Sequence, residues 1–256
     1  EPQGSWKTWL ILAGRGFGKT RTGAETLKKW ISSGQSKRIA LIGETSHDVR
    51  QIMIEGPSGI LSLYPHWERP HYEPSKRRLT WPNGAIAQAF SGDTPSQLRG
   101  PQFDAAWVDE LAKFKDPEKT WQQLLMGLRL GENPKAIITT TPRPLKFLKD
   151  LMANPSTIVT KGSTFENATN LAPNFIAEMK KHFSGTRIGL QELYAEMLED
   201  EHGSLWSQDM LSKAHAQAPT LPLSRIVVAI DPAVTSKSGS DETGIIVAGL
   251  DQEGRG

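Results

Sequence analysis

The chain contains no cysteine among its 256 residues, so neither a disulfide framework nor a thiolate metal site can form. No apolar run approaches the roughly 20 residues that a membrane-spanning helix needs, and no charged-then-apolar signal segment opens the chain. Basic and acidic residues nearly balance, at 30 against 28, so any contact with nucleic acid must come from local patches. We therefore expect a soluble, intracellular protein without a membrane partner. The candidate basic patches, each of which could equally be a solvated surface, are Lys76-Arg77-Arg78, Arg143 and Lys180-Lys181.

Glycines stand at positions 14, 16 and 18, at a junction between a strand pattern and a helix pattern. The apolar run over 8–13 leads into a turn that ends in Gly18-Lys19-Thr20, and helix-forming sequence follows. Glycines let backbone N–H groups curl around a phosphate, and the helix directs the positive end of its dipole at the same anion. The sequence therefore predicts a phosphate-binding loop. Its predicted ATP-binding residues are Ala13, Gly14, Arg15, Gly16, Phe17, Gly18, Lys19 and Thr20.

Two of these residues have predicted chemical roles. Lys19 would reach the β- and γ-phosphates of ATP, and the Thr20 hydroxyl would be a ligand of Mg²⁺. The first motif position departs from the usual pattern, because Ala13 stands where glycine is expected. The alternative is an ordinary glycine-rich turn, but the strand before it and the helix after it favour the phosphate loop.

Two adjacent carboxylates end a second apolar run. The segment 103–110 reads as a short buried strand that finishes in Asp109 and Glu110. In open α/β sheets, the carboxyl ends of parallel strands border the ligand crevice. Asp109 would hold the Mg²⁺ shell, and Glu110 would orient and polarise the attacking water. A solvated acid pair is the alternative, and the preceding phosphate loop favours the catalytic interpretation.

Three hydroxyls end a third apolar run, over 136–141. This strand is expected to lie beside the strand of the phosphate loop, where Thr139, Thr140 and Thr141 could sense the γ-phosphate. Threonine is also common in strands for its β-propensity. The spacing leaves both interpretations open.

Taken in order, these motifs resemble the large terminase subunit of tailed bacteriophages, and the resemblance runs through almost the whole chain. Each piece is weak by itself, but the ordered set is specific. The segments that carry it are Ala13-Gly-Arg-Gly-Phe-Gly-Lys-Thr20, Gln97-Leu-Arg-Gly-Pro101, Phe103-Asp-Ala-Ala-Trp-Val-Asp-Glu110, Ile138-Thr-Thr-Thr-Pro-Arg-Pro144, Glu166-Asn-Ala-Thr-Asn-Leu-Ala-Pro173, Gln191-Glu-Leu-Tyr-Ala-Glu-Met-Leu-Glu-Asp200, Val228-Ala-Ile-Asp-Pro-Ala233 and Asp241-Glu-Thr-Gly244.

The resemblance implies further roles at matching positions. Arg15 resembles the arginine of the family's phosphate loop, which contacts phosphate within its own subunit. Arg99 resembles the arginine that a ring-forming terminase offers to its neighbour's ATP, although by position alone it could be a surface arginine. The threonines at 139–141 resemble the motif that couples hydrolysis to movement. With Lys19 and Glu110, Arg99 completes the predicted catalytic set.

Alternating strand and helix patterns indicate a doubly wound α/β architecture. The resemblance implies a P-loop NTPase of the ASCE type, with a mostly parallel sheet flanked by helices. A small helical linker subdomain and the first strands of a ribonuclease H-like nuclease domain would follow. The expected boundaries are 1–165 for the ATPase domain, 166–203 for the helical subdomain, 204–224 for a linker and 225–256 for the start of the nuclease domain.

Local signals predict the individual elements. Thr45 is expected to cap a helix through Ile54, and Asn83-Gly84 suits a type I′ turn in a hairpin over 78–90, inserted before the acidic strand. The other predicted strands cover 38–43 and 157–160, and the other predicted helices cover 18–31, 117–130, 144–152, 173–183 and 186–199.

The last apolar runs, over 225–231 and 243–250, resemble the opening hairpin of a ribonuclease H-like nuclease. Asp231 would be a ligand of a two-metal site for Mg²⁺ or Mn²⁺, and Asp241 would support the metals. The alternative is an ordinary hairpin with solvated acids. Because the sequence stops at Gly256 and lacks an initiating methionine, we expect an internal or truncated piece, with nuclease activity only in the full-length protein.

The resemblance implies an ATP-hydrolysing motor that translocates double-stranded viral DNA into the procapsid. Its expected partners are that DNA, the portal protein, the small terminase subunit and copies of itself in a ring, for which a pentamer is expected. The expected location is the host cytoplasm, transiently docked on the procapsid and absent from the mature virion. The alternatives are a helicase-like nucleic-acid-dependent ATPase and a scaffold that binds ATP without hydrolysing it.

Overall fold

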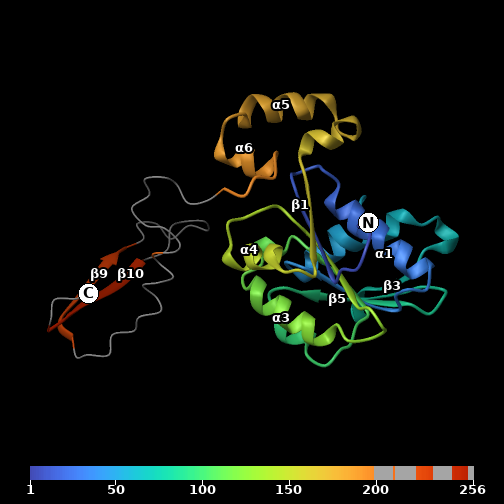
Figure 1. Ribbon diagram of the computed structural model, residues 1–256, viewed down its shortest axis with the longest axis horizontal. Helices are drawn as coiled ribbons and strands as arrows, with labels where there is room; N and C mark the ends of the chain where they lie inside the picture. The colour runs from blue at the N-terminus through green and yellow to red at the C-terminus, as the bar shows by residue number, and fades with distance from the viewer. Residues whose placement is uncertain (199–209, 211–222, 233–243, 253–256) are drawn as a thin grey trace. The chain divides into compact units, whose positions relative to one another are not determined.

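One eight-stranded sheet forms the centre of the larger of two units in the computed structural model (Figure 1). The structure describes residues 1–198, 210, 223–232 and 244–252, and the two units are Glu1–Glu199 and Asp200–Gly256. The strand order is β3-β4-β5-β2-β6-β7-β1-β8. The strands are β1 (Thr8–Ala13), β2 (Arg38–Gly43), β3 (His71–Glu73), β4 (Arg78–Thr80), β5 (Ile86–Ser91), β6 (Ala105–Asp109), β7 (Lys135–Thr140) and β8 (Thr157–Gly162).

Helices cover both faces of this sheet. α1 (Lys19–Ser32) packs on one face, where Leu27 and Trp30 join a core with Leu41 and Trp107. α3 (Pro117–Gly127) and α4 (Lys146–Ala153) pack on the other face. The central strands consist mainly of apolar residues because they are buried on both sides, and their polar residues lie at the strand ends. This layering confirms the predicted α/β architecture with a mostly parallel sheet.

The order of the central strands brings three predicted motifs to one edge of the sheet. β7 lies between β1 and β6 and pairs in parallel with both. The carboxyl ends of β1, β6 and β7 carry the phosphate loop, the two acids and the threonines, so these motifs converge. The prediction that the threonine strand lies beside the loop strand is confirmed.

Shorter helical segments complete the larger unit. α5 (Pro173–Phe183) and α6 (Arg187–Glu192) lie together at one end of it (Figure 1). The remaining segments are α2 (Ser46–Asp48), the π-helical η1 (Val49–Ile54), and the 3₁₀ segments η2 (Ile60–Leu63), η3 (His66–Glu68), η4 (Pro74–Lys76), η5 (Pro95–Leu98), η6 (Leu111–Lys113) and η7 (Thr164–Asn170).

The predicted hairpin exists, but its turn and its place differ from the prediction. Gly84 has a positive φ of 83° and Asn83 does not, so the turn cannot be type I′, which needs a positive φ at both central residues. Instead, Gly84 N–H donates to Trp81 O at 2.9 Å, and Trp81 N–H donates to Ala85 O at 2.9 Å. β5 also pairs in parallel with β2. The hairpin therefore extends the central sheet and is not an insertion.

Three predicted helices differ from the observed ones in extent or type. Thr45 caps its helix through a reciprocal pair of hydrogen bonds with Asp48, but the segment continues as the π-helix η1. α3 ends at Gly127, because Leu128 forms a parallel bridge with Phe103. The helix expected over 186–199 ends at Glu192 in α6, after which the chain turns back towards the phosphate loop.

The smaller unit contains an antiparallel pair of strands, β9 (Leu223–Asp231) and β10 (Gly244–Asp251). Both strands were predicted. Asp231 lies exposed at the end of β9, in register with Gly244, and Asp241 lies outside the described residues. The nuclease assignment and the domain boundaries stay predictions.

Within the described part of the chain, no helix has the length and apolarity to cross a membrane.

Candidate nucleotide-binding site

Residues 14–18 form a tight loop between β1 and the N-terminus of α1. Gly16 and Gly18 adopt positive φ values of 78° and 103°, a conformation that glycine reaches without steric cost. Gly18 is the N-cap of the 14-residue α1, and Lys19 is its first residue. The loop thus leads directly into the N-terminus of α1, where the first N–H groups of a helix have no partner within it and the helix dipole favours an anion.

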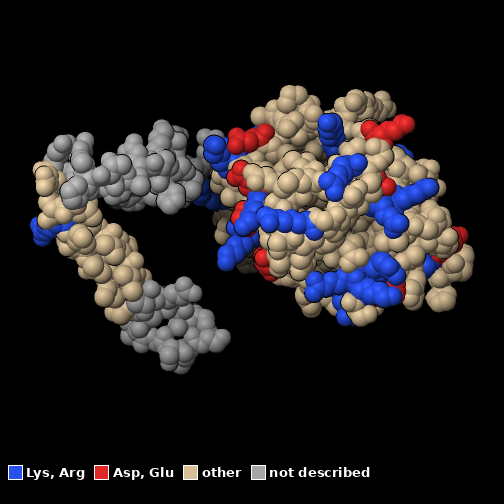
Figure 2. All heavy atoms as spheres, turned by 90° about the horizontal axis from the view of Figure 1, so that it is seen from below, with Lys and Arg blue, Asp and Glu red and all other residues tan. Residues whose placement is uncertain are grey.

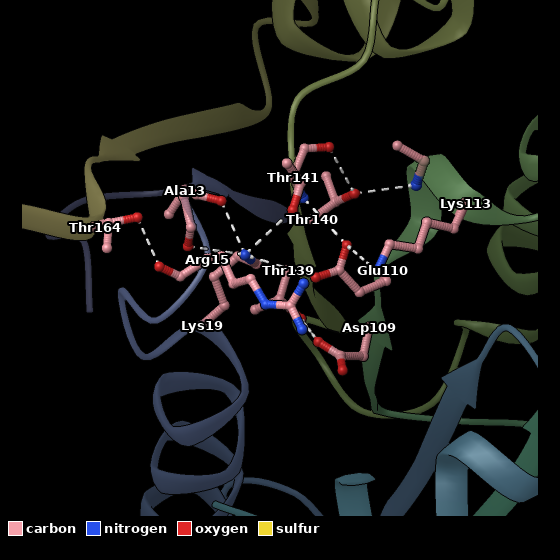
Figure 3. A network of polar contacts seen from close by, with 12 residues as sticks. Ala13, Arg15, Lys19, Asp109, Glu110, Lys113, Thr139, Thr140, Thr141 and Thr164 are labelled. Atoms are coloured by element: carbon pink, nitrogen blue, oxygen red, sulfur yellow. Dashed lines mark hydrogen bonds and ion pairs between the residues drawn. The ribbon is translucent and has the colours of Figure 1, made fainter. Parts of the chain in front are cut away.

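Lys19 lies at the centre of the polar network in Figure 3. Its Nζ donates to Ala13 O at 2.8 Å, to Gly14 O at 3.1 Å and to Thr141 Oγ1 at 3.3 Å. Glu110 Oε1 is 3.6 Å from the same nitrogen. The ammonium group is buried, so these contacts hold it at the mouth of the loop.

Asp109 ends β6 with its side chain buried. Thr139 Oγ1 donates to Asp109 Oδ1 at 2.5 Å. Burial raises the pKa of Asp109 to about 7, and the charge of Glu110 also raises it, whereas the Thr139 hydrogen bond and Lys19 lower it. A carboxylate that is costly to ionise in this environment gains from a nearby cation.

Glu110 adopts a left-handed backbone conformation, with φ 57° and ψ 41°. This conformation costs a non-glycine residue about 1–2 kcal/mol. Its N–H donates to Thr139 O at 2.5 Å, and its Oε2 accepts from Thr141 N–H at 3.3 Å. The bend turns the side chain towards Lys19, whereas Asp109 lies on the strand itself (Figure 3). Adjacent acids thereby take different positions.

The three threonines have different contacts. Thr139 bonds Asp109, and Thr141 bonds both Lys19 and Glu110. Thr140 Oγ1 accepts from Ala112 N–H at 3.1 Å and so holds the segment that follows Glu110. Every one of these side chains is buried. The strand thus connects the loop lysine to both acids, and their role in coupling stays a prediction.

A segment far along the chain holds the outer side of the phosphate loop. Thr164 Oγ1 donates to Arg15 O at 2.6 Å, and Asn167 Nδ2 donates to Gly16 O at 2.7 Å. Arg15 N–H donates to Glu192 O at 2.6 Å. These supporting residues were not predicted individually, although Glu166-Asn-Ala-Thr-Asn170 was among the segments that carried the resemblance.

The remaining predicted residues lie as follows. Thr20 is half-buried in the first turn of α1, and Phe17 packs partly buried against Gly162. Arg15 is exposed. Arg99 follows η5 and is not part of the network in Figure 3. Its Nε donates instead to Gln123 Oε1 on α3, at 2.9 Å. The guanidinium is exposed, and the role expected of Arg99 across a subunit interface stays a prediction.

The residues present fit a Mg²⁺-bound nucleotide. Mg²⁺ takes oxygen ligands and is usually bound by one or two carboxylates together with substrate phosphates. The loop cradle suits the phosphates, while the Thr20 hydroxyl and the buried Asp109 carboxylate supply the oxygens that the protein would contribute. A self-contained metal cage is not needed, and no cluster of His, Cys, Asp and Glu suited to a metal occurs among the described residues.

Residues 10–213 match the family model described as terminase large subunit, T4likevirus-type, N-terminal. The chain belongs to this terminase family. Membership favours the terminase interpretation of the motifs over the helicase-like alternative.

Solved terminase structures share the fold. The large terminase ATPase domain of Thermus phage P74-26 aligns with a TM-score of 0.58 at 16% identity, over 77% of this chain and 90% of that one. The HK97 bacteriophage large terminase aligns with a TM-score of 0.59 at 15% identity, over 97% of this chain but 57% of that one. The large terminase of a thermophilic bacteriophage, solved in complex with ADP, aligns with a TM-score of 0.65 at 14% identity, over 96% of this chain and 60% of that one. This terminase chain therefore spans less than two thirds of the two longer proteins.

The contact between Thr164 and the phosphate loop leads to a stability prediction. Thr164 is fully buried, and Thr164→Val removes its hydroxyl while keeping its shape. Leaving the Arg15 carbonyl without this donor should lower the free energy of unfolding by about 1–3 kcal/mol, measured by urea denaturation. Thr26→Val is the matched control, because the buried Thr26 hydroxyl only donates back to the helix carbonyl of Thr22. Equal losses in both variants would contradict a specific role for Thr164.

Proposed function

We propose that this terminase chain is the ATP-hydrolysing motor portion of a viral DNA-packaging machine. The observation that carries the proposal is the convergence of Lys19, Asp109 and Glu110 on one glycine-lined loop. Binding of ADP and of ATPγS by a large terminase with the same fold supports it. The work of the motor would be the translocation of double-stranded DNA into the procapsid.

Each side chain has a proposed part in ATP hydrolysis. The loop backbone and Lys19 bind and orient the phosphates, Thr20 and Asp109 hold Mg²⁺, and Glu110 orients the attacking water and accepts its proton. Bound Mg²⁺ would neutralise charge on the phosphate oxygens. Arg99 would complete the site of a neighbouring subunit, and Arg15 would contact phosphate within its own subunit.

Other aspects of the proposal concern the longer protein and its partners. We infer a metal-dependent endonuclease that uses two divalent cations, with Asp231 as one ligand, and that cuts concatemeric DNA. The proposed partners are the portal protein, the small terminase subunit and other copies of the chain in a ring. The proposed location is the host cytoplasm, docked transiently on the procapsid.

The surface charge of the larger unit offers several places for DNA to bind. Figure 2 shows Lys and Arg in separate groups on the visible face, with Asp and Glu among them. Of the predicted basic patches, Lys76 and Arg78 contact Glu73 at 2.6 and 2.8 Å, so part of their charge is balanced. The DNA-contacting residues stay predictions.

The test of the proposed function is phosphate release from Mg-ATP over a range of protein concentrations. Lys19→Ala should lower both nucleotide affinity and turnover by at least about 100-fold, because the lysine supplies a positive charge at the site of phosphoryl transfer. Lys29→Ala is the matched control, since Lys29 is an exposed lysine in the last turn of the same helix that contacts Glu1. Normal turnover by Lys19→Ala, or no nucleotide binding by the unaltered chain, would contradict the proposal.

A further inference from the structure

Trp107 is a fully buried side chain two residues before Asp109 on β6. Alternate residues of a strand point to the same face, so Trp107 and Asp109 lie on the same side of the sheet. Trp107 belongs to the core that α1 covers on that side. The proposed hydrolysis mechanism gives this tryptophan no role.

The indole of Trp107 is the first member of a chain of two hydrogen bonds. Its Nε1–H donates to Thr139 Oγ1 at 2.9 Å, and Thr139 Oγ1 in turn donates to Asp109 Oδ1 at 2.5 Å. All three side chains are at most 5% exposed. Both bonds therefore lie away from bulk water, where a hydrogen bond is electrostatically stronger.

The direction of the chain follows from its chemistry. An indole N–H can only donate, and a hydroxyl has a single proton. When Thr139 accepts from Trp107, its own proton must point elsewhere. The two acceptors in reach are Asp109 Oδ1 at 2.5 Å and Val108 O at 3.3 Å. When Asp109 is ionised, as it would be against a bound cation, the shorter bond to its carboxylate is the stronger one. Trp107 thus presents the Thr139 proton to the carboxylate and fixes the rotation of that carboxylate.

The same indole lies directly on the backbone of α1. A Cβ atom at Gly23 would be 2.4 Å from Trp107 Cε2 and 2.5 Å from its Nε1, distances that no side chain can accommodate. Gly23 is three residues after Thr20, close to one helical turn. Trp107 therefore spans from the helix that carries Thr20 to the strand that carries Asp109.

We propose that Trp107 is a positioning residue of the Mg-nucleotide site, which sets the Asp109 carboxylate relative to Thr20 through the Thr139 hydroxyl and the α1 backbone. The inference rests on the proposed function, because it assigns the carboxylate and the hydroxyl to the same bound cation. It predicts that the indole N–H supports metal-dependent nucleotide binding more than binding of the nucleotide alone.

The test replaces Trp107 with 3-benzothienylalanine, an isostere that has sulfur in place of the N–H, introduced by amber suppression. ATPγS affinity is measured by calorimetry with saturating Mg²⁺ and again with EDTA. Loss of one net hydrogen bond should reduce the Mg²⁺-dependent gain in affinity by about fivefold. The affinity in EDTA should stay within about twofold, because the phosphate loop is unchanged.

Trp9 is a matched control in the same chain. Its Nε1 donates to Thr160 Oγ1 at 2.9 Å, the same kind of pair between β1 and β8, without a carboxylate acceptor. The isostere at Trp9 should leave the Mg²⁺-dependent gain unchanged. Thr139→Val should reduce the Mg²⁺-dependent gain in affinity as much as the Trp107 isostere does. In the Thr139→Val background the Trp107 isostere should have no further effect. Thr139→Ser keeps the hydroxyl and should retain the full gain.

Three results would overturn the inference. An unchanged Mg²⁺-dependent gain in the Trp107 isostere would mean that the indole N–H has no positioning role. Equal losses with Mg²⁺ and with EDTA would identify Trp107 as a packing residue only. Additive losses in the double variant would show that Thr139 does not relay the effect. Failure of the unaltered chain to bind ATPγS under either condition would instead contradict the proposed function itself.

Discussion

Glu110→Gln should bind ATP with unchanged or higher affinity and hydrolyse it at least about 100-fold more slowly, the size of effect expected when a general base is lost. The amide keeps the shape of the side chain but cannot accept the proton of the attacking water. Glu110 also lies 3.6 Å from Lys19 Nζ. Neutralising it frees the lysine charge for the phosphates, so weaker binding is not expected.

Two measurements separate binding from turnover in this variant. Affinity for Mg-ATPγS comes from calorimetry, and turnover comes from phosphate release at saturating Mg-ATP. Glu118→Gln is the matched control, because Glu118 is an exposed acid on α3 that contacts Gln122. A Glu110→Gln protein that hydrolyses ATP at the normal rate would remove Glu110 from the catalytic role.

The succession of residue types along the chain was enough to predict much of the site. A strand, glycines, Lys19 and a helix follow one another within a few residues, and that order specifies the loop by backbone geometry alone. Asp109 and the threonines could be predicted because each ends an apolar run, and parallel strands bring their carboxyl ends to one edge of a sheet. The pairing of β7 with both β1 and β6 completed the site as expected.

The contacts that support the loop could not be predicted in the same way. Thr164 reaches Arg15, and Asn167 reaches Gly16, across about 150 positions of the chain, and such polar residues look like ordinary loop residues in a sequence. The left-handed conformation of Glu110 also escapes a propensity argument, because glycine is the residue expected there. Backbone strain of this kind concentrates at functional sites, which is consistent with the role proposed for Glu110.

The placement of the hairpin shows a different limit. Asn83-Gly84 correctly indicated a turn, but the choice of turn depended on how Trp81 and Ala85 hydrogen-bond across it. Whether β5 joins the central sheet depends on its pairing with β2, a long-range contact that alternation along one strand does not encode. Local signals thus predicted that the hairpin exists, but they did not predict that its strand β5 pairs with β2.

Arg99→Ala should lower turnover by about 10³-fold or more, the size of effect expected of an arginine that stabilises the transferring phosphoryl group. The variant should regain activity when it is mixed with Lys19→Ala subunits. Neither variant can work alone in a ring. An Arg99→Ala subunit still has its own Lys19 and Glu110 to bind ATP. A Lys19→Ala subunit binds ATP far more weakly but still offers its own Arg99. Mixed rings therefore contain complete sites at their junctions.

The position of Arg99 supports this experiment. The residue is exposed and held by Gln123 on α3, outside the network around Lys19, so removing it should leave the nucleotide affinity of its own subunit unchanged. Arg69→Ala is the control, because Arg69 is an exposed arginine elsewhere in the larger unit, between η3 and β3. Phosphate release is measured across ratios of Arg99→Ala to Lys19→Ala protein, and ring assembly is followed by mass photometry. Recovery of ATP turnover should peak at intermediate ratios, where junctions between the two variants are most frequent. Absence of recovery in rings shown to contain both variants would mean that Arg99 does not act across a subunit interface.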